Sequence, residues 1–335
     1  MSLHTFYRIL GIMRTRLWAV ANMVIRNRRH LQRWIEIFLV TASILVLWNT
    51  PSGSRPLASF ESSTDAAMHD LSLDQIVLFG DSITQHSFNP EIQGWGATVA
   101  HTYMRKLDVI NRGYSGYNTL WAKEILASTI KSTLPPPSTG ASVPRSLPRI
   151  KLMTLFFGAN DAVLPDINPK QHVPLREYKL YLHEMLDTIR RESPGTKVLV
   201  ITPPPIDPTV WGNKCIGKGN QPDRTVAQTR AYRNAVVQVG REAKETWGAD
   251  LVLVDTWKEF LGERSEVEYG MEEVADLLSD GLHLAAKGNQ LLAKGVLKAI
   301  AENWPELKAE GLKPRVITHD QVDTDNLPDC LYGNL

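Results

Sequence analysis

The chain has 335 residues, 43% of them hydrophobic, which is enough for one large α/β domain with a substantial core. Its formal net charge is +1, so the molecule as a whole lacks the basic excess typical of nucleic-acid-binding proteins. Two cysteines, Cys215 and Cys330, are too few for a disulfide framework in a chain of this length. Composition therefore favours a globular α/β protein and excludes the nucleic-acid-binding and disulfide-rich classes.

The first fifty residues form a basic arm, because residues 1–50 contain seven arginines, no lysine and one acid, Glu36. The apolar run Ile37–Trp48 within it would measure roughly 18 Å as a helix, short of the roughly 30 Å core of a bilayer. Three interpretations compete: a single-pass membrane anchor at residues 35–48, a mitochondrial targeting segment, and an extension of a cytoplasmic protein. The charge bias favours the anchor, and hence association with a membrane.

Residues 51–72 are rich in Ser, Pro, Ala and Asp, a composition that predicts a flexible linker. The folded domain is accordingly predicted to span residues 73–335. Inside it, residues 132–149 form a second stretch rich in proline and serine, which predicts an exposed loop whose role the sequence does not indicate.

Strand and helix patterns alternate through the domain. Apolar runs bounded by Gly or Pro predict strands at 75–80, 108–113, 150–158, 197–205 and 250–255. Amphipathic patterns predict helices at 94–107, 118–132, 174–193, 223–248 and 285–304. Near-continuous apolar strands separated by helices indicate a five-stranded parallel sheet covered on both faces, with ligands bound beyond the carboxyl ends of the strands.

Polar motifs occupy these predicted strand ends. They are Gly80-Asp81-Ser82, "NRGYSGYNT" (111–119), "GAND" (158–161) and, after the fifth strand and a helical segment, "SDGLHL" (279–284). Because the carboxyl ends of parallel strands share one edge, we expect the four motifs to meet there.

Together the motifs supply what acyl transfer requires. The hydroxyl of Ser82 needs a base within hydrogen-bond reach, and His283 is the candidate, with Asp280 placed to orient the imidazole. A developing oxyanion needs preorganised donors, for which the backbone N–H groups of Ser82 and Gly116 and the amide of Asn160 are candidates.

Each motif also has a purely structural interpretation. Asp81 suits a helix cap, and "GAND" suits an Asx turn in which Asp161 fixes the loop. Asp81, Trp95, Tyr117 and Asp161 are candidate pocket residues, although aromatic side chains at such places are as often part of the core.

No metal or cofactor is predicted. His86, His101, His172 and His183 could suggest a metal site, but none has a second ligand at a usual spacing.

The four motifs resemble the conserved blocks of the SGNH, or GDSL-type, hydrolase family, over roughly residues 75–304. "FGDSITQ", "NRGYSGYNT", "FFGANDA", "VPLREY" and "ITPPPID" further resemble its isoamyl acetate-hydrolysing esterase branch. The resemblance implies a three-layer α/β/α, flavodoxin-like fold and a metal-free serine esterase. It also implies a catalytic triad of Ser82, Asp280 and His283, and an oxyanion hole of Ser82, Gly116 and Asn160.

The expected function is hydrolysis of small carboxylic esters, such as isoamyl acetate, through an acyl-enzyme. Two alternatives stay open: an esterase of lipids, lysophospholipids or acetylated carbohydrates, and an inactive membrane-anchored binding protein with the same fold. The intact Ser82, Asp280 and His283 count against the inactive protein. A small-molecule ester is the expected partner, nucleic acid is not, and the oligomeric state is not predicted.

Overall fold

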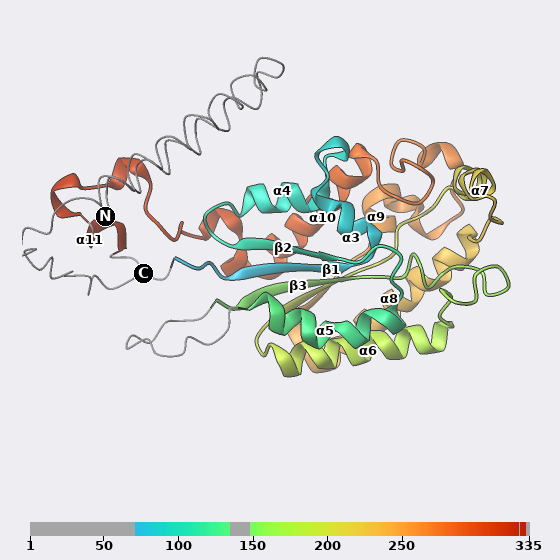
Figure 1. Cartoon of the computed structure of the whole chain (residues 1–335), viewed down its shortest axis with the longest axis horizontal. Coiled ribbons are helices and arrows are strands. Elements are labelled where there is room, and N and C mark those ends of the chain that lie inside the picture. Colours follow the sequence, from blue (N-terminus) through green and yellow to red (C-terminus); the bar gives the residue numbers. More distant parts are fainter. Residues whose placement is uncertain (1–70, 135–147, 328, 333–335) are drawn as a thin grey trace, which may run out of the picture. The chain divides into compact units, whose positions relative to one another are not determined.

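A computed structural model describes residues 71–134, 148–327 and 329–332 (Figure 1). Its centre is a parallel five-stranded sheet in the order β2-β1-β3-β4-β5. The strands are β1 (Gln75–Gly80), β2 (Asp108–Gly113), β3 (Ile150–Phe156), β4 (Lys197–Ile201) and β5 (Leu251–Val254). This is the strand order of flavodoxin-like sheets, so the predicted α/β fold class is confirmed.

Helices cover both faces of the sheet and make the three-layer sandwich (Figure 1). One face packs against α4 (Trp95–Thr102), α9 (Thr256–Leu261) and α10 (Ala286–Asn303). The other packs against α5 (Thr119–Thr133), α6 (Leu175–Glu192) and α8 (Val226–Trp247). The remaining described α-helices are α3 (Ser82–Gln85), α7 (Pro208–Gly217) and α11 (Asp329–Tyr332).

Strand β1 shows why the sequence specifies this arrangement. Ile76 and Leu78 enter the core under α4 and α10, while Val77 and Phe79 enter the core over α5 and α6. Successive strand side chains point to opposite faces, so both sets must be apolar when both faces are covered. That requirement produces the continuous apolar run.

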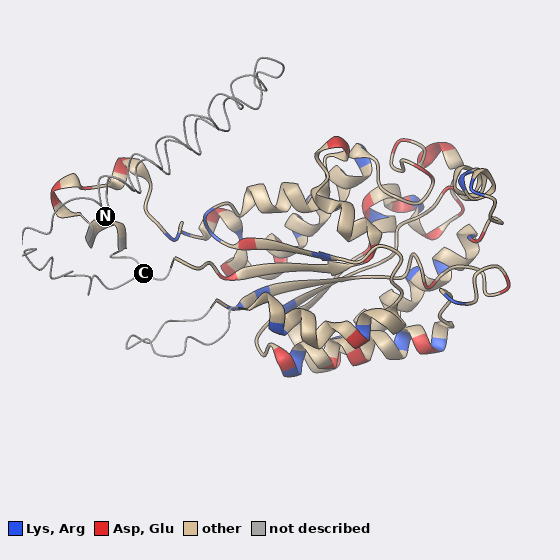
Figure 2. Ribbon diagram, in the orientation of Figure 1, with Lys and Arg blue, Asp and Glu red and all other residues tan. Residues whose placement is uncertain are grey.

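Mixed charge characterises the outer helices. Basic and acidic residues alternate along α6, the amphipathic helix of the lower layer in Figure 2. Its apolar side packs into the core through Tyr178, Leu182, Met185, Leu186 and Ile189. The helix thus follows the three-and-four spacing expected for one buried stripe and one solvated face.

The sheet order determines where loops converge. Gly80 at the end of β1 pairs with Gly113 of β2 on one side and with Phe156 of β3 on the other. The connection from β1 to β2 passes through α4 on one face of the sheet, and the connection from β2 to β3 passes through α5 on the other. The loops after these three strands therefore start at one level. The first three polar motifs follow these strands directly.

Several predictions fall outside the described residues. The basic arm, the segment 35–48, the linker as far as residue 70 and residues 135–147 of the proline-rich insert are among them. In the part of the chain that the structure describes, no helix is both long enough and apolar enough to span a membrane.

Candidate active site

Ser82 lies at the start of a short helix directly after the central strand β1. Asp81 is the N-cap of α3, and its Oδ1 accepts a hydrogen bond from the backbone N–H of Ile83 at 2.9 Å. As the first residue of α3, Ser82 has a backbone N–H with no acceptor inside the helix. The structural and the chemical interpretations of this motif are therefore compatible, since the cap orients the helix that carries the serine.

The structure brings Ser82, His283 and Asp280 together. His283 Nε2 lies 2.9 Å from Ser82 Oγ, although the two residues are 201 positions apart in the sequence. The other ring nitrogen, Nδ1, lies 2.9 Å from Asp280 Oδ2. Asp280 Oδ1 accepts the backbone N–H groups of His283 at 2.8 Å and Leu282 at 3.1 Å. The three side chains form a continuous hydrogen-bonded chain.

The carboxylate of Asp280 selects the imidazole tautomer. Burial opposes its ionisation, but hydrogen bonds from His283 and Lys214 outweigh burial and hold the pKa of Asp280 well below its usual range. An ionised carboxylate only accepts hydrogen bonds, so the neutral imidazole carries its proton on Nδ1. Nε2 is then free to accept the hydroxyl proton of Ser82.

A glycine makes the turn between Asp280 and His283 possible. Gly281 has φ +83°, and a Cβ there would lie 2.5 Å from the carbonyl oxygen of Asp207 and 2.6 Å from the backbone nitrogen of Trp211. The backbone N–H of Asp207 donates to the carbonyl of Gly281 at 2.9 Å. The turn at 280–283 thus packs against α7, a helix that was not predicted from the sequence.

The candidate oxyanion donors Gly116 and Asn160 lie in one hydrogen-bonded cluster. Gly116 follows β2 and Asn160 follows β3. The side-chain amide of Gln171 joins them, because its Nε2 donates to the carbonyl of Gly116 at 2.8 Å and to Asn160 Oδ1 at 3.1 Å. A contact from Ser115 N–H to Gln85 Oε1, at 2.8 Å, ties the Gly116 loop to α3.

The hydrogen bonds of Asn160 fix which way its amide points. Its Oδ1 accepts from Gln171 and, at 3.4 Å, from Arg224 Nη2, while its Nδ2 donates to the carbonyl of Tyr117 at 2.8 Å. An amide NH₂ has two hydrogens, so one remains for a ligand. Arg224 is buried, paired with Asp223 at 2.7 Å, and donates to the carbonyl of Ala159.

Three of the four candidate pocket residues are closed to substrate, which corrects the prediction. Trp95 is fully buried: its ring packs against Phe156 with centroids 6.3 Å apart, and its Nε1 donates to a backbone carbonyl. Asp81 and Asp161 are also buried, below 2% exposure. Tyr117 alone is half-buried, with its ring beside Tyr114. The sequence pattern alone did not distinguish Trp95, which is buried in the core, from Tyr117, which is half-buried.

The buried carboxyls of Asp81 and Asp161 have internal structural roles. Asp161 Oδ1 accepts the backbone N–H of Thr119 at 2.8 Å and its hydroxyl at 2.5 Å, which secures the start of α5. Each carboxyl keeps one buried Oδ2 with no hydrogen-bond partner. Burial raises the pKa of Asp81 to about 6 and that of Asp161 to about 7.

One hollow includes two residues of the candidate triad, and a second lies beside Lys214 and Trp211, which contact the triad. The first has a volume of about 250 Å³, and its lining combines Asp280 and His283 with apolar and polar side chains: Ile83, Ile92, Leu284, His86, Asn89, Lys214, Ser279 and Asn289. A larger groove of about 600 Å³ lies between residues 166–168 and α7, and its lining is mainly polar: Asp166, Asn168, Lys214, Lys218, Asn220, Gln221 and Asp223 contribute to it. The smaller hollow therefore combines apolar and polar side chains, whereas the larger groove is mainly polar.

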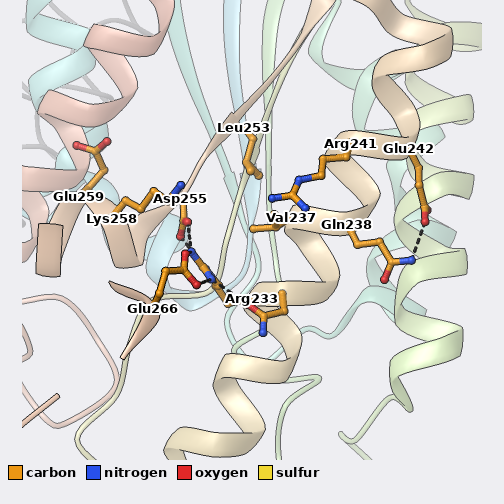
Figure 3. A pocket seen from close by; sticks show the side chains of 11 residues that line it. Arg233, Val237, Gln238, Arg241, Glu242, Leu253, Asp255, Lys258, Glu259 and Glu266 are labelled. Carbon is orange, nitrogen blue, oxygen red and sulfur yellow. Dashed lines mark hydrogen bonds and ion pairs between the residues drawn. The ribbon is translucent and has the colours of Figure 1, made fainter. Parts of the chain in front are cut away.

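A third hollow, of about 770 Å³, lies between α8, β5 and α9 and shares no lining residue with the triad (Figure 3). Arg233 is buried there and is paired with Asp255 and Glu266. The charge of Arg233 is paired within the protein, so this cluster ties α8 to the end of β5 and to the segment that carries Glu266.

Three side chains that hydrogen-bond to the predicted site residues were not predicted from the sequence: Gln171, Arg224 and Lys214. None belongs to a motif at a strand end. The signal for α7 was present, because Asp207-Pro208 is the typical pair of N-cap and first helical residue. Nothing in the local sequence singles out Gln171 or Arg224.

Comparison with known proteins identifies the family of the chain. A model described as the GDSL-like Lipase/Acylhydrolase family matches residues 78–291. A mouse protein named isoamyl acetate-hydrolyzing esterase 1 homolog is 40% identical over 219 residues, covering 65% of this chain and 78% of that protein. The human protein of the same name is 39% identical, with 65% and 77% covered. A GDSL esterase/lipase of Arabidopsis thaliana is 34% identical over 267 residues, with 75% and 95% covered. The chain therefore belongs to the GDSL-like lipase/acylhydrolase family and is a carboxylic ester hydrolase.

Proposed function

We propose that the protein hydrolyses short-chain carboxylic esters, with Ser82 as nucleophile, His283 as general base and Asp280 as the group that orients the imidazole. The observation that carries the proposal is the 2.9 Å contact between His283 Nε2 and Ser82 Oγ, together with the matching contact to Asp280. A serine hydroxyl becomes nucleophilic when an adjacent base can take its proton.

The reaction follows from these contacts. His283 Nε2 accepts the Ser82 proton while Oγ attacks the ester carbonyl, and Asp280 stabilises the imidazolium that forms. The backbone N–H groups of Ser82 and Gly116 and the free amide hydrogen of Asn160 bind the tetrahedral oxyanion. Collapse of this intermediate breaks the bond to the alcohol oxygen, which leaves with the proton from His283. Water then attacks the acyl-serine by the same steps and restores the enzyme.

We propose acetates of short alcohols such as isoamyl acetate as substrates. Support comes from the curated mouse and human relatives, which are named for hydrolysis of that ester. The volume of the hollow beside His283, about 250 Å³, also suits a short alkyl group better than a long chain, and Ile83, Ile92 and Leu284 are among its lining residues.

An esterase acting on acetylated carbohydrates is the second candidate. The observation that favours it is the polar groove of about 600 Å³ between residues 166–168 and α7. Its lining offers amide, carboxylate and ammonium groups with no net charge, since Asp166 and Asp223 balance Lys214 and Lys218. Such a surface can bind hydroxyl groups through both donors and acceptors.

Active-site labelling and a substrate series test the proposal together. Full-length protein should react covalently with a fluorophosphonate and hydrolyse phenyl acetate, and Ser82→Ala should do neither, with a loss of turnover on the order of 10⁴-fold or more. Absence of labelling in the wild type would instead favour an inactive binding protein. Turnover of isoamyl acetate, an acetylated methyl glucoside and a long-chain ester then separates the substrate classes.

Association with a membrane through residues 35–48 also remains a proposal, supported by the arginine-rich composition of residues 1–50. Fractionation of full-length tagged protein tests it. Recovery in the membrane fraction after a high-salt wash supports the anchor, and recovery in the soluble fraction excludes it.

A further inference from the structure

A lysine from α7 contacts the carboxylate of the proposed triad. Lys214 Nζ forms an ion pair with Asp280 Oδ2. The same oxygen lies 2.9 Å from His283 Nδ1. One carboxylate oxygen therefore receives both the imidazole and an ammonium group, while the other oxygen receives two backbone N–H groups.

The placement of Lys214 depends on how α7 docks against the turn that bears Asp280. The cap residue Asp207 accepts two backbone N–H groups at the start of α7 and donates its own N–H to the Gly281 carbonyl. One turn further, the ring of Trp211 lies edge-on to His283, with centroids 6.0 Å apart. Lys214 is three residues later, on the same side of the helix, with its Nζ 5.4 Å from the Trp211 ring.

We propose that Lys214 is a positioning residue of the active site, which holds Asp280 in the orientation that His283 requires and weakens the negative field of Asp280 at the imidazole. This inference rests on the triad proposed above. Lys214 needs no contact with substrate for this role, because it acts entirely through Asp280.

The charged and titratable groups around the imidazole come from several elements. Asp280 lies on the same turn, Lys214 comes from α7, and Asp81 precedes α3 and interacts electrostatically with His283. His86, from the 3₁₀ helix η1 (His86–Phe88), has its ring centroid 5.9 Å from that of His283. A comparison of variants that differ only at Lys214 leaves the other three groups unchanged.

The sign of the effect follows from charge. Protonation of His283 removes the base, and a nearby positive charge disfavours the imidazolium. Loss of the Lys214 charge should therefore move the acidic limb of the activity profile to higher pH. Since the side chain of Lys214 is 35% exposed, we expect the small end of the range for a neighbouring charge, about one pH unit.

The test compares Lys214→Met, Lys214→Arg and the control Lys298→Met in full-length protein. Lys298 lies on α10 and is exposed, and it lines none of the hollows described above. The readout is the rate of Ser82 phosphonylation by a fluorophosphonate across about pH 5 to about pH 9, which does not depend on the natural substrate. The pH dependence of kcat/KM for phenyl acetate gives a second profile.

Lys214→Met should shift the acidic limb of the pH profile upward by about one pH unit, and Lys214→Arg and Lys298→Met should leave it in place. Folding should survive, because Asp280 keeps both backbone donors and His283. If the acidic limb of the pH profile of Lys214→Met coincides with that of the wild type, the inference is overturned, even if the maximal rate of the variant is lower. If Ser82→Ala still reacts like the wild type, the triad itself is wrong, so the two failures are distinguishable.

Discussion

Replacing Asp161 with asparagine should change how the stability of the protein depends on pH. Asp161 is fully buried, its Oδ2 has no hydrogen-bond partner, and burial raises its pKa from 3.8 to about 7. The folded state thus holds this proton more tightly than the unfolded chain. The stability that the protonated group provides is present below about pH 4 and is lost as the pH rises toward 7.

The size of the effect follows from the two pKa values. At about 1.4 kcal/mol for each pH unit, linkage gives a loss of about 2.5 kcal/mol in unfolding free energy between about pH 5 and about pH 8. Asparagine keeps an oxygen for both hydrogen bonds from Thr119 but carries no charge. The free energy of unfolding of Asp161→Asn, relative to the wild type, should therefore rise by about 2.5 kcal/mol over that range.

Urea denaturation of the full-length wild type and of Asp161→Asn at a series of pH values measures this difference. Asp166→Asn is the matched control, because Asp166 is an exposed carboxyl on the following loop. Parallel wild-type and Asp161→Asn curves from about pH 5 to about pH 8 would refute the reasoning, since they would mean that Asp161 binds no extra proton on folding.

Three further substitutions test the loops that form the site. Asn160→Ala removes an oxyanion donor and should lower kcat/KM for phenyl acetate on the order of 100-fold while thermal unfolding changes little; an unchanged kcat/KM would exclude the amide from catalysis. Gly116→Ala adds a Cβ in ordinary contact with Gln171, at 3.8 Å, but at φ +80°, so a urea titration should show a loss of about 1 kcal/mol and no more. Gly281→Ala would place its Cβ 2.5 Å from the Asp207 carbonyl, so it should cost more stability than Gly116→Ala and reduce turnover; equal stability losses would contradict this packing.

The sheet could be predicted from the sequence because its strands are buried on both faces. A run such as Gln75–Gly80, with all six residues buried, has no solvated side that would interrupt the apolar pattern. Two predicted strands, 75–80 and 108–113, match the observed bounds, whereas the other three ran too long, as in 197–205 against the observed Lys197–Ile201. The prolines that follow Ile201 end the backbone pairing, although the side chains of residues 202–207 are still buried. The apolar pattern therefore indicates which side chains are buried, and not which residues pair in the sheet.

Residues close to the reacting atoms were easier to predict than those that support them. Ser82, Asn160 and His283 lie in short motifs because each needs one chemical type and a tight local backbone. Lys214 supports Asp280 from 66 positions away, and Arg224 supports Asn160 from 64 positions away. Such contacts form only when the chain has folded, so no local sequence pattern predicts them.

Supporting positions also tolerate more chemical variety than the groups they hold. Asn160 needs a donor to its Oδ1, and an arginine and a glutamine both serve here. Asp280 needs donors around its carboxylate, and it receives them from two backbone N–H groups, an imidazole and an ammonium group. Of these donors, only the ammonium group of Lys214 can be replaced without changing the 280–283 turn or the base His283. If the proposed role of Lys214 is right, a substitution at this position changes the pH range of the reaction while the triad stays intact.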